Sequence, residues 1–276
     1  MENILITGAS TGIGHACVKY LIERDYFVFG SVRKEADAQR LQDEFGNHFQ
    51  ALLFDVTDEP AIEKAKLEVL TKLNGQKLRA VINNAGIALG GPLKYLPTSD
   101  VRQQLEVNVV GLLSVCRAFI PLLENPTNPG RIINISSVSG LLVSPFTSLY
   151  SASKFAVEAL TLGLRRELYF HGVTAVSIQP GPIKTPIWNK AMSFQGKYDH
   201  TEYKNVLTDM DGFIKKMEAD AIPAERVAKV VFKAIVARRP KPTYLIMKGA
   251  FIARMITWLP HRWVDLLMSS RVKKLQ

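Results

Sequence analysis

A serine, a tyrosine and a lysine in this sequence are spaced to perform acid–base chemistry together. Tyr150 and Lys154 stand four residues apart in a helical stretch, so both side chains lie on one helix face. A free phenol titrates near ~10, and an ammonium beside it favours the phenolate and lowers its pKa. Tyr150 could then exchange a proton near neutral pH. Ser137 follows a short apolar run 13 residues upstream, where its hydroxyl could hydrogen-bond a carbonyl or alcohol oxygen.

A glycine-rich turn near the N-terminus is the second chemical feature. The turn Gly8-Ala-Ser-Thr-Gly12-Ile-Gly14 joins a strand-like run to a helical stretch. Glycines allow the backbone to approach a pyrophosphate, and a helix N-terminus offers free N–H groups and a positive dipole end. This strand–turn–helix context is the one that a dinucleotide fingerprint requires, although the spacing is GxxxGxG rather than GxGxxG. An ordinary tight turn is the alternative for this pattern alone.

The end of the second strand-like run indicates which dinucleotide would bind. An acid at this point would hydrogen-bond the 2′-hydroxyl of the adenosine ribose. Here the run ends without an acid, and Arg33 and Lys34 follow. Two cations favour a 2′-phosphate, so NADP(H) is predicted, with NAD(H) and a solvated charge pair as the alternatives. Asp55, after the third run, could accept a hydrogen bond from the adenine amino group or lie near a helix N-terminus.

These residues need a scaffold, and the hydrophobic pattern predicts one. Apolar strand-like runs alternate with helical stretches, which is typical of βαβ units and a parallel sheet covered on both faces. We expect an α/β fold: one Rossmann-type, doubly wound sheet of about seven strands over residues 1–248, and a helical extension over 249–276. The expected strands are Ile4–Thr7, Phe27–Ser31, Ala51–Phe54, Ala80–Asn83, Arg131–Ser136, Val173–Gln179 and Thr243–Met247. The expected helices are Ile13–Arg24, Ala61–Leu73, Thr98–Leu123, Ser151–Phe170 and 223–238.

Composition narrows the class of protein. The chain has 276 residues, of which 47% are hydrophobic and 22% charged, so it is an ordinary globular protein rather than a disordered one. Its two cysteines, Cys17 and Cys116, lie in apolar runs without a CxxC or Cys/His cluster. We therefore expect no disulfide framework, no metal site and a reducing, cytoplasmic location. The first residues lack the basic and apolar regions of a signal peptide.

Positive charge is concentrated at the C-terminal end. The net charge is +10, and the last 51 residues carry 12 Lys and Arg against one acid, Asp265. Such asymmetry suggests an anionic partner, and without a recognised nucleic-acid module we do not expect nucleic acid. Residues 249–276 mix large apolar side chains with Arg and Lys, as helices at a membrane interface do, and Pro260 predicts two short helices there. A helix pair packed on the body and a dimer contact are the alternatives.

Taken together, the motifs resemble those of the short-chain dehydrogenase/reductase family. The resemblance covers about residues 3–240 and follows the family's order. Three parts of the chain more loosely resemble the branch that contains retinol and 17β-hydroxysteroid dehydrogenases: the run Gly140–Pro145, the helix with Phe155-Ala-Val-Glu-Ala, and the C-terminal extension. The motifs are Thr7-Gly8-Ala-Ser-Thr-Gly12-Ile-Gly14, Asp55, Asn83-Asn84-Ala85-Gly86, Asn108, Ser137, Tyr150-Ser-Ala-Ser-Lys154 and Pro180-Gly181-Pro-Ile-Lys-Thr185.

The resemblance implies a role for each of these residues. Tyr150 would be the catalytic acid/base, Lys154 would lower its pKa and bind the nicotinamide ribose, and Ser137 would orient the substrate oxygen. Asn108 would hold a water in a proton relay by distorting its helix. Thr11 stands where many NADP-preferring members carry a basic residue, so the cofactor preference depends on Arg33. The expected cofactor contacts are Gly8, Ser10, Thr11, Gly12, Ile13, Gly14, Arg33, Asp55, Val56, Asn84, Ala85, Gly86, Tyr150, Lys154, Pro180, Gly181, Ile183 and Thr185.

The implied reaction transfers a hydride between a nicotinamide ring and a carbonyl carbon. Segment 186–222 corresponds to the family's variable substrate-binding segment, and its aromatic residues could line an apolar pocket with Leu141, Leu142, Val143 and Phe146. Such a pocket favours a hydrophobic alcohol or ketone. The looser resemblance to the retinol and 17β-hydroxysteroid dehydrogenase branch implies a steroid, a retinoid or a long-chain lipid as substrate, and the family resemblance implies a homo-oligomer. Ordinary core packing is the alternative for these side chains. The alternative functions are a cofactor-binding regulator on the same fold and a carbonyl reductase of small polar substrates.

Overall fold

A seven-stranded parallel sheet forms the centre of the protein. The computed structural model describes residues 1–125, 127–185, 196–209, 212 and 221–266. The strand order is β3-β2-β1-β4-β5-β6-β7, and every neighbouring pair is parallel. This confirms the predicted doubly wound sheet. The strands are β1 (Asn3–Ile6), β2 (Phe27–Val32), β3 (Phe49–Leu53), β4 (Leu78–Asn83), β5 (Arg131–Ile135), β6 (Thr174–Pro180) and β7 (Thr243–Ile246).

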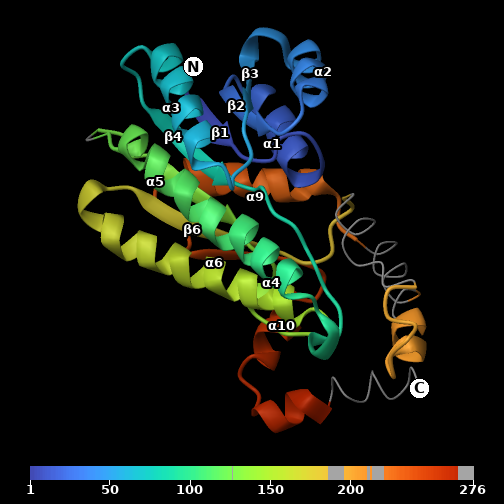
Figure 1. Ribbon diagram of the computed structural model, residues 1–276. Coiled ribbons are helices and arrows are strands. Elements are labelled where there is room, and N and C mark those ends of the chain that lie inside the picture. The colour runs from blue at the N-terminus through green and yellow to red at the C-terminus, as the bar shows by residue number, and fades with distance from the viewer. Residues whose placement is uncertain (126, 186–195, 210–211, 213–220, 267–276) are drawn as a thin grey trace.

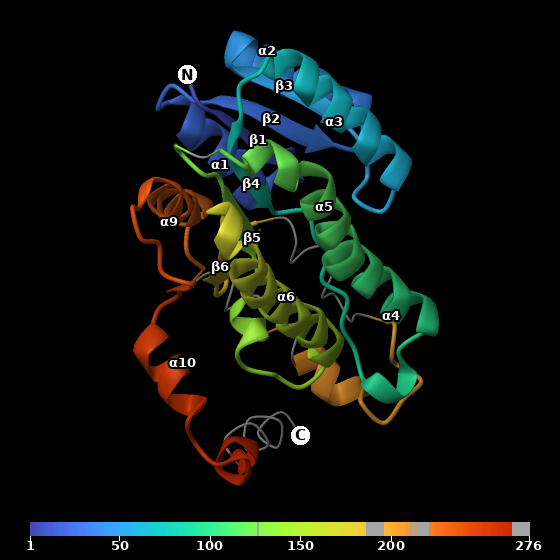
Figure 2. The ribbon, with the colours of Figure 1, turned by 90° about the vertical axis from the view of Figure 1, so that its left-hand side faces the viewer.

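Helices cover both faces of this sheet (Figures 1 and 2). One face packs against α1, α2 and α9, and the other against α3, α5 and α6. The helix α4 continues through a π-helical turn (Glu106–Val110) into α5. The helices are α1 (Gly12–Ile22), α2 (Glu35–Phe45), α3 (Glu59–Leu73), α4 (Thr98–Leu105), α5 (Gly111–Leu123), α6 (Ser148–Glu167), α9 (Ala224–Val236) and α10 (Ala250–Ile256).

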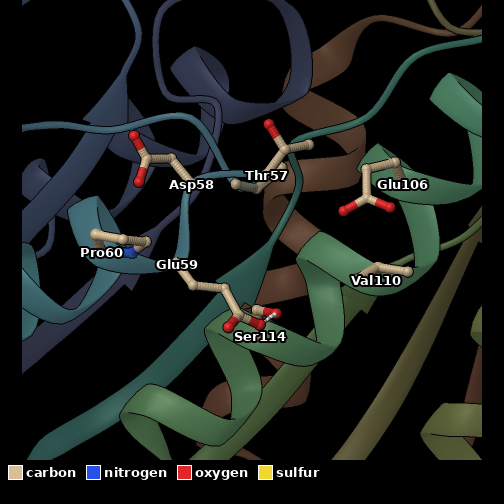
Figure 3. A pocket seen from close by; sticks show the side chains of 8 residues that line it. Thr57, Asp58, Glu59, Pro60, Glu106, Val110 and Ser114 are labelled. Carbon is tan, nitrogen blue, oxygen red and sulfur yellow. Dashed lines mark hydrogen bonds between the residues drawn. The ribbon is translucent and has the colours of Figure 1, made fainter.

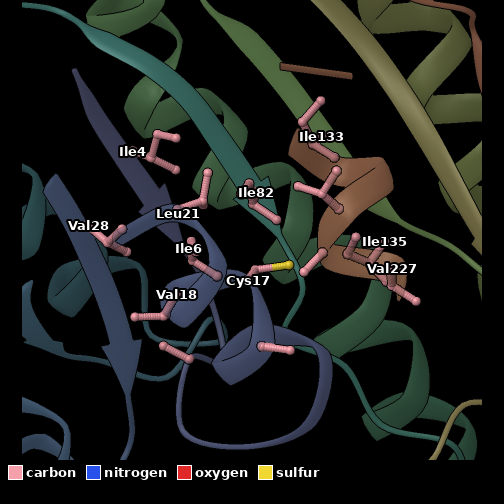
Figure 4. Close-up of a cluster of buried hydrophobic side chains, with 14 of the residues drawn as sticks. Ile4, Ile6, Cys17, Val18, Leu21, Val28, Ile82, Ile133, Ile135 and Val227 are labelled. Carbon is pink, nitrogen blue, oxygen red and sulfur yellow. The ribbon is translucent and has the colours of Figure 1, made fainter. Parts of the chain in front are cut away.

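The hydrophobic core lies in two layers, one on each side of the sheet. Figure 4 shows the layer beneath α1 and α9, where aliphatic side chains of both helices meet those of the central strands. Cys17 of α1 and Val227 of α9 are both fully buried there. Both β1 and β4 carry aliphatic residues on both faces, and nearly all of their residues are buried, which strongly favours a central position in the sheet. The core therefore fixes the strands whose ends carry the functional residues.

The chain order creates a topological switch point. The chain passes from β1 outward to β2 and β3, and then returns to β4 on the other side of β1. The connections that leave the carboxyl ends of β1 and β4 consequently diverge, and open α/β sheets bind ligands in the crevice at such a point. The glycine-rich turn follows β1, and the segment Asn83–Gly86 begins at the last residue of β4. The fold thus places two of the predicted motifs side by side.

The elements differ from the sequence expectation in two instructive places. The helix α2 was not expected, because its sequence is mostly polar and it buries only Leu41. The helix α6 begins at Ser148 rather than Ser151 and ends at Glu167 rather than Phe170, so Tyr150 lies within its first turn. Pro260 interrupts the extension as expected: α10 ends at Ile256, and helical structure resumes at residue 261.

Among the residues that the structure describes, one helical stretch is long and apolar enough to cross a membrane by composition. It spans Thr98–Leu123, with a mean hydropathy of 1.6 in its most apolar window. Half of that window is buried inside the protein, and Val115 and Phe119 are fully buried against the sheet. Burial of this kind is typical of a core helix, and the stretch therefore gives only weak support for a membrane span.

Candidate active site

A single large cavity gathers the predicted site residues at the carboxyl end of the sheet. Its volume is about 840 Å³, and α10 with the preceding loop forms part of its wall. Two predicted residues, Gly14 and Asn108, do not line it. The predicted residues that line it are Gly8, Ser10, Thr11, Gly12, Ile13, Arg33, Asp55, Val56, Asn84, Ala85, Gly86, Ser137, Tyr150, Lys154, Pro180, Gly181, Ile183 and Thr185.

The glycine-rich turn is held open as a cradle for a ligand. Gly8 and Gly12 have φ angles of +67° and +58°, a backbone conformation that residues with a Cβ atom rarely adopt. The Asn84 side chain donates hydrogen bonds to the carbonyl oxygens of Thr7 and Gly8, at 3.0 and 2.9 Å. The hydroxyl of Thr7 accepts from the backbone N–H groups of Asn84 and Ala85. Thr7 therefore ties the turn after β1 to the segment after β4, a role that the sequence reasoning missed although Thr7 is in the motif.

Gly14 lies behind the cradle rather than in it. A Cβ at this position would collide with the carbonyl oxygen of Gly8 and lie 2.6 Å from the Asn84 side-chain nitrogen. We expect Gly14→Ala to displace the cradle and to weaken dinucleotide binding by at least about tenfold. Tenfold corresponds to about 1.4 kcal/mol of binding free energy, which is within the usual cost of overpacking. Titration calorimetry with NADPH measures this.

The matched control is Gly163→Ala. A Cβ on Gly163, in α6, would meet only the end of the flexible Glu167 side chain, at 3.6 Å. Alanine also favours a helix over glycine, so this variant should bind NADPH normally and unfold at the same or a higher temperature. Equal affinities of Gly14→Ala and Gly163→Ala for NADPH would show that the cradle does not depend on Gly14.

A cation lies at the wall of the cavity directly after β2. Arg33 is 3.5 Å from the Asp55 carboxylate, and its side chain is 71% exposed. Burial would raise the pKa of Asp55, but hydrogen bonds from Thr57 and the charge of Arg33 outweigh burial and hold that pKa below its usual range. A second arginine, Arg40 of α2, donates to the Ser10 carbonyl oxygen at 2.8 Å. Sequence reasoning missed Arg40 because it did not predict α2.

The three catalytic candidates meet at one wall of the cavity. Ser137 follows β5, and Tyr150 and Lys154 come from α6. Ser137 and Tyr150 form a side-chain hydrogen bond. The Lys154 ammonium donates to the Ile135 carbonyl oxygen at 2.9 Å and lies 5.7 Å from the centre of the Tyr150 ring. A substrate oxygen at this wall would therefore face two hydroxyl groups, with a buried cation behind them.

The pKa of Tyr150 differs from the sequence expectation. Burial raises it to about 12, and the hydrogen bond with Ser137 lowers it only in part. The Lys154 ammonium donates to the Ile135 carbonyl oxygen and not to the phenol, so no direct hydrogen bond from Lys154 offsets the effect of burial on the pKa of Tyr150. Burial also lowers the pKa of Lys154 to about 8, although the nearby charge of Glu158 acts to raise that pKa. Tyr150 is thus a phenol at neutral pH, the form that can donate a proton.

These values predict how carbonyl reduction depends on pH. Lys154 is protonated below about 8 and loses its charge as the pH rises through that value, whereas Tyr150 stays protonated. We expect kcat/KM for reduction to fall above about pH 8. In Lys154→Arg the cation cannot be deprotonated, so any residual activity should lack this decline. A wild-type profile that stays level well above pH 8 would contradict the assignment.

Asn108 acts behind the cavity wall and not in it. It lies in the π-helical turn between α4 and α5 and is buried. Its amide exchanges two hydrogen bonds with the backbone of Ile87, both of 2.9 Å, and donates to the Ser153 hydroxyl at 3.0 Å. Ser153 donates in turn to the Tyr150 carbonyl oxygen at 2.7 Å. The helix distortion expected at Asn108 is therefore present, and Ser153, which the sequence reasoning did not single out, connects it to the catalytic helix.

A second hollow lies beside the turn after β3 and has a different chemistry (Figure 3). It measures about 560 Å³, and three carboxylates line it, those of Asp58, Glu59 and Glu106. Carboxylates would repel the phosphates of a dinucleotide, so this hollow is not a second nucleotide site. Within the described part of the chain, no group of three or more His, Cys, Asp or Glu side chains is placed to hold a metal ion.

The substrate side of the cavity is described only in part. Leu142 lines the cavity. Phe146 and Tyr203 do not line it but pack against each other in a small cluster that also includes the cavity residue Tyr150. Val143 is 48% exposed. Much of segment 186–222 lies outside the described residues, including Trp188, Met192, Phe194 and Phe213.

The C-terminal extension contributes to the cavity, which the sequence reasoning did not foresee. The pattern there indicated an apolar, basic helix, but nothing in the pattern could show which part of the body it would contact. The residues of the extension and its preceding loop that line the cavity are Met247, Lys248, Gly249, Ile252, Ala253 and Ile256.

The residues present fit a dinucleotide with a 2′-phosphate. The cradle has no room for a Cβ at Gly14, the helix α1 begins at Gly12 in the turn, and a cation rather than an acid follows β2. The Tyr150 hydroxyl shares the same cavity. Fold and site together define a nicotinamide-dependent oxidoreductase of the Rossmann type.

Comparison with known proteins identifies the family to which the chain belongs. Residues 2–196 match the model of the short chain dehydrogenase family, and the chain belongs to this family. It is 38% identical to the NADPH-dependent 3-dehydrocapnine reductase of Ornithobacterium rhinotracheale, over 100% of this chain and 99% of that protein. It is 29% identical to the 3-ketodihydrosphingosine reductase of Bacteroides thetaiotaomicron, over 93% of each chain. A closed form of serine dehydrogenase complexed with NADP⁺ superposes with a TM-score of 0.75 at 26% identity, covering 89% of this chain and 94% of that one.

Proposed function

We propose that this protein uses NADPH to reduce the 3-oxo group of a long-chain lipid ketone of the sphingoid-base type. Two relatives that align over nearly their whole length are named for reducing 3-dehydrocapnine and 3-ketodihydrosphingosine, and the first name specifies NADPH. NADP(H) is the favoured cofactor, in agreement with Arg33 and with the missing acid after β2. NAD(H) remains the alternative.

One observation carries the substrate class: the cavity continues from the catalytic wall to an apolar wall. The loop between β5 and α6 contributes Val138, Leu142 and Pro145, and α10 contributes Ile252 and Ile256. Apolar lining of this kind gains free energy by burying hydrocarbon, at roughly 0.8 kcal/mol per CH₂ group. A long alkyl chain makes use of such a wall, whereas a small polar ketone does not.

The chain's own residues supply binding, orientation and the proton. When bound, the dinucleotide supplies the hydride that the carbonyl carbon receives. The Ser137 hydroxyl donates a hydrogen bond to the carbonyl oxygen and orients it. The Tyr150 hydroxyl donates its proton to that oxygen, so the carbonyl becomes an alcohol. The Lys154 ammonium, held at Ile135, stabilises the negative charge that Tyr150 then carries.

The test is NADPH oxidation with a set of ketones of matched reactivity. We expect kcat/KM for 3-ketodihydrosphingosine to exceed that for a short-chain amino ketone by at least about 100-fold, since each buried CH₂ contributes to binding. Faster turnover of the short ketone would favour a carbonyl reductase of small polar substrates. NADPH binding without turnover of any long-chain, steroid or retinoid ketone would favour a cofactor-binding regulator and overturn the proposal.

The proposal also includes the organisation and setting of the protein. We assign residues 1–248 to the catalytic domain, with 186–222 as its substrate-binding segment, and 249–276 to the basic extension. A homo-oligomer is supported by exposed apolar side chains on the π-helical turn and on α6, such as Val110 and Phe155, which are 44% and 43% exposed. Two buried, unpaired cysteines, Cys17 and Cys116, agree with a cytoplasmic location. Peripheral membrane contact through 249–276 is argued below.

A further inference from the structure

The helix α10 has one side in the cavity and one side in solvent. Ala253 is 5% exposed and anchors the helix, and Ile256 on the same side lines the cavity. Gly249, with φ +72°, turns the chain out of β7 and into α10. Figure 2 shows α10 and the following helical turn extending from the body, away from α1, α2 and α3. The wall of the cavity is therefore a helix with a free outer side.

That outer side is strongly apolar. Phe251, Met255 and Trp258 recur at the spacing of one helix face and are 75%, 51% and 87% exposed. The next turn adds Trp263, which is 62% exposed. A single exposed apolar side chain is normal on a protein surface. Several large ones exposed side by side cost free energy in water and therefore mark an interaction surface. We call Phe251, Arg254, Met255, Trp258, Arg262 and Trp263 the tail face.

The charges of the tail face determine which partner fits it. Arg254 and Arg262 are exposed beside these aromatic and aliphatic side chains. Only Asp265 opposes them within 249–276, and the remainder of that segment adds Arg271, Lys273 and Lys274 in sequence. Two copies of this chain meeting through the tail face would bring like charges together. An anionic bilayer complements the face, because its headgroups pair with cations while Trp and Phe lie at the acyl boundary.

We propose that the tail face docks on the surface of an anionic bilayer and that the lipid ketone enters the cavity from this bilayer along α10. The inference rests on the proposed function, because a lipid substrate that resides in the membrane would need the path along α10 from the bilayer to the cavity. The exposed Ile252 also lines the cavity, so one side chain faces both the outer surface and the substrate space. Docking would place the alkyl chain against apolar surface throughout its transfer and avoid the cost of full exposure to water.

The experiment is vesicle flotation of the full chain and two double variants. We expect the wild-type protein to float with vesicles that contain phosphatidylglycerol, to float less with pure phosphatidylcholine, and to be released by salt. The variant Trp258→Ser with Trp263→Ser should lose most of this binding. The matched control is Tyr169→Ser with Phe170→Ser, which removes an aromatic pair in the 3₁₀ turn after α6. These side chains are 77% and 92% exposed, and the variant should float like the wild type.

Activity separates failure of docking from failure of the proposed function. With 3-ketodihydrosphingosine in anionic vesicles, the Trp258/Trp263 variant should lose at least about tenfold in rate, while its rate on a detergent-dispersed ketone stays unchanged. Equal loss on both substrates would mean a structural defect and would overturn the docking proposal. Wild-type protein that stays unbound to anionic vesicles, or a double variant whose main change is a smaller oligomer, would overturn it as well. Vesicle binding with no turnover of either form of the ketone would refute the proposed function and, with it, the entry of the ketone from the bilayer, but would leave the docking of the tail face established.

Discussion

Replacing Tyr150 with phenylalanine should reduce kcat for ketone reduction by about 10²–10⁴-fold, the usual contribution of a positioned acid or base. The variant keeps the ring and its packing and loses only the hydroxyl that would donate the proton. Its hydrogen-bond partner Ser137 is buried at the end of β5 and stays in place. NADPH affinity, measured by fluorescence titration, should remain within about twofold of the wild type. The reason is that the Tyr150 hydroxyl would contribute only a small part of the free energy of NADPH binding.

Two comparisons make this prediction specific. Tyr20→Phe removes a hydroxyl from α1, on the opposite side of the fold, and should leave kcat unchanged. Lys154→Met should lower kcat as well, because the phenolate left by Tyr150 would lack a cation. A Tyr150→Phe variant that turns over at the wild-type rate would remove the proposed acid and, with it, the mechanism.

Replacing Arg33 with alanine should separate the two nicotinamide cofactors. A charged hydrogen bond to a phosphate contributes about 1.5–3 kcal/mol, so the Kd for NADPH should rise by about 10–100-fold. NADH has no 2′-phosphate, and its Kd should change little. The loss for NADPH should become smaller at high salt, because Arg33 is largely exposed and its charge is screened.

The adjacent Lys34 gives the control for this prediction. Lys34 is exposed and precedes α2. It does not line the cavity. Lys34→Ala should therefore weaken both cofactors slightly and equally. Equal weakening of NADPH and NADH in Arg33→Ala would contradict the preference for NADP(H) and would leave Arg33 as a partner of Asp55 alone.

The sequence alone determined the sheet, its parallel arrangement and the local motifs. Each of these depends on neighbours in the chain: apolar runs become buried strands, and glycines with a following helix form the turn after β1. The spacing of Tyr150 and Lys154 likewise sets their common helix face without any tertiary contact. The family likeness of the motifs then supplied the roles of residues that no pattern could assign, such as Ser137.

Tertiary structure decided what depends on burial and on distant partners. Burial raises the pKa of Tyr150 to about 12, which the spacing of Tyr150 and Lys154 could not show, because desolvation is a property of the whole surrounding cavity. The polar helix α2 forms although its sequence gives little pattern, and it brings Arg40 to the glycine-rich turn. Only the path of the chain after β7 places α10 against the cavity, since an amphipathic pattern shows that a helix has two sides but not which surfaces they meet.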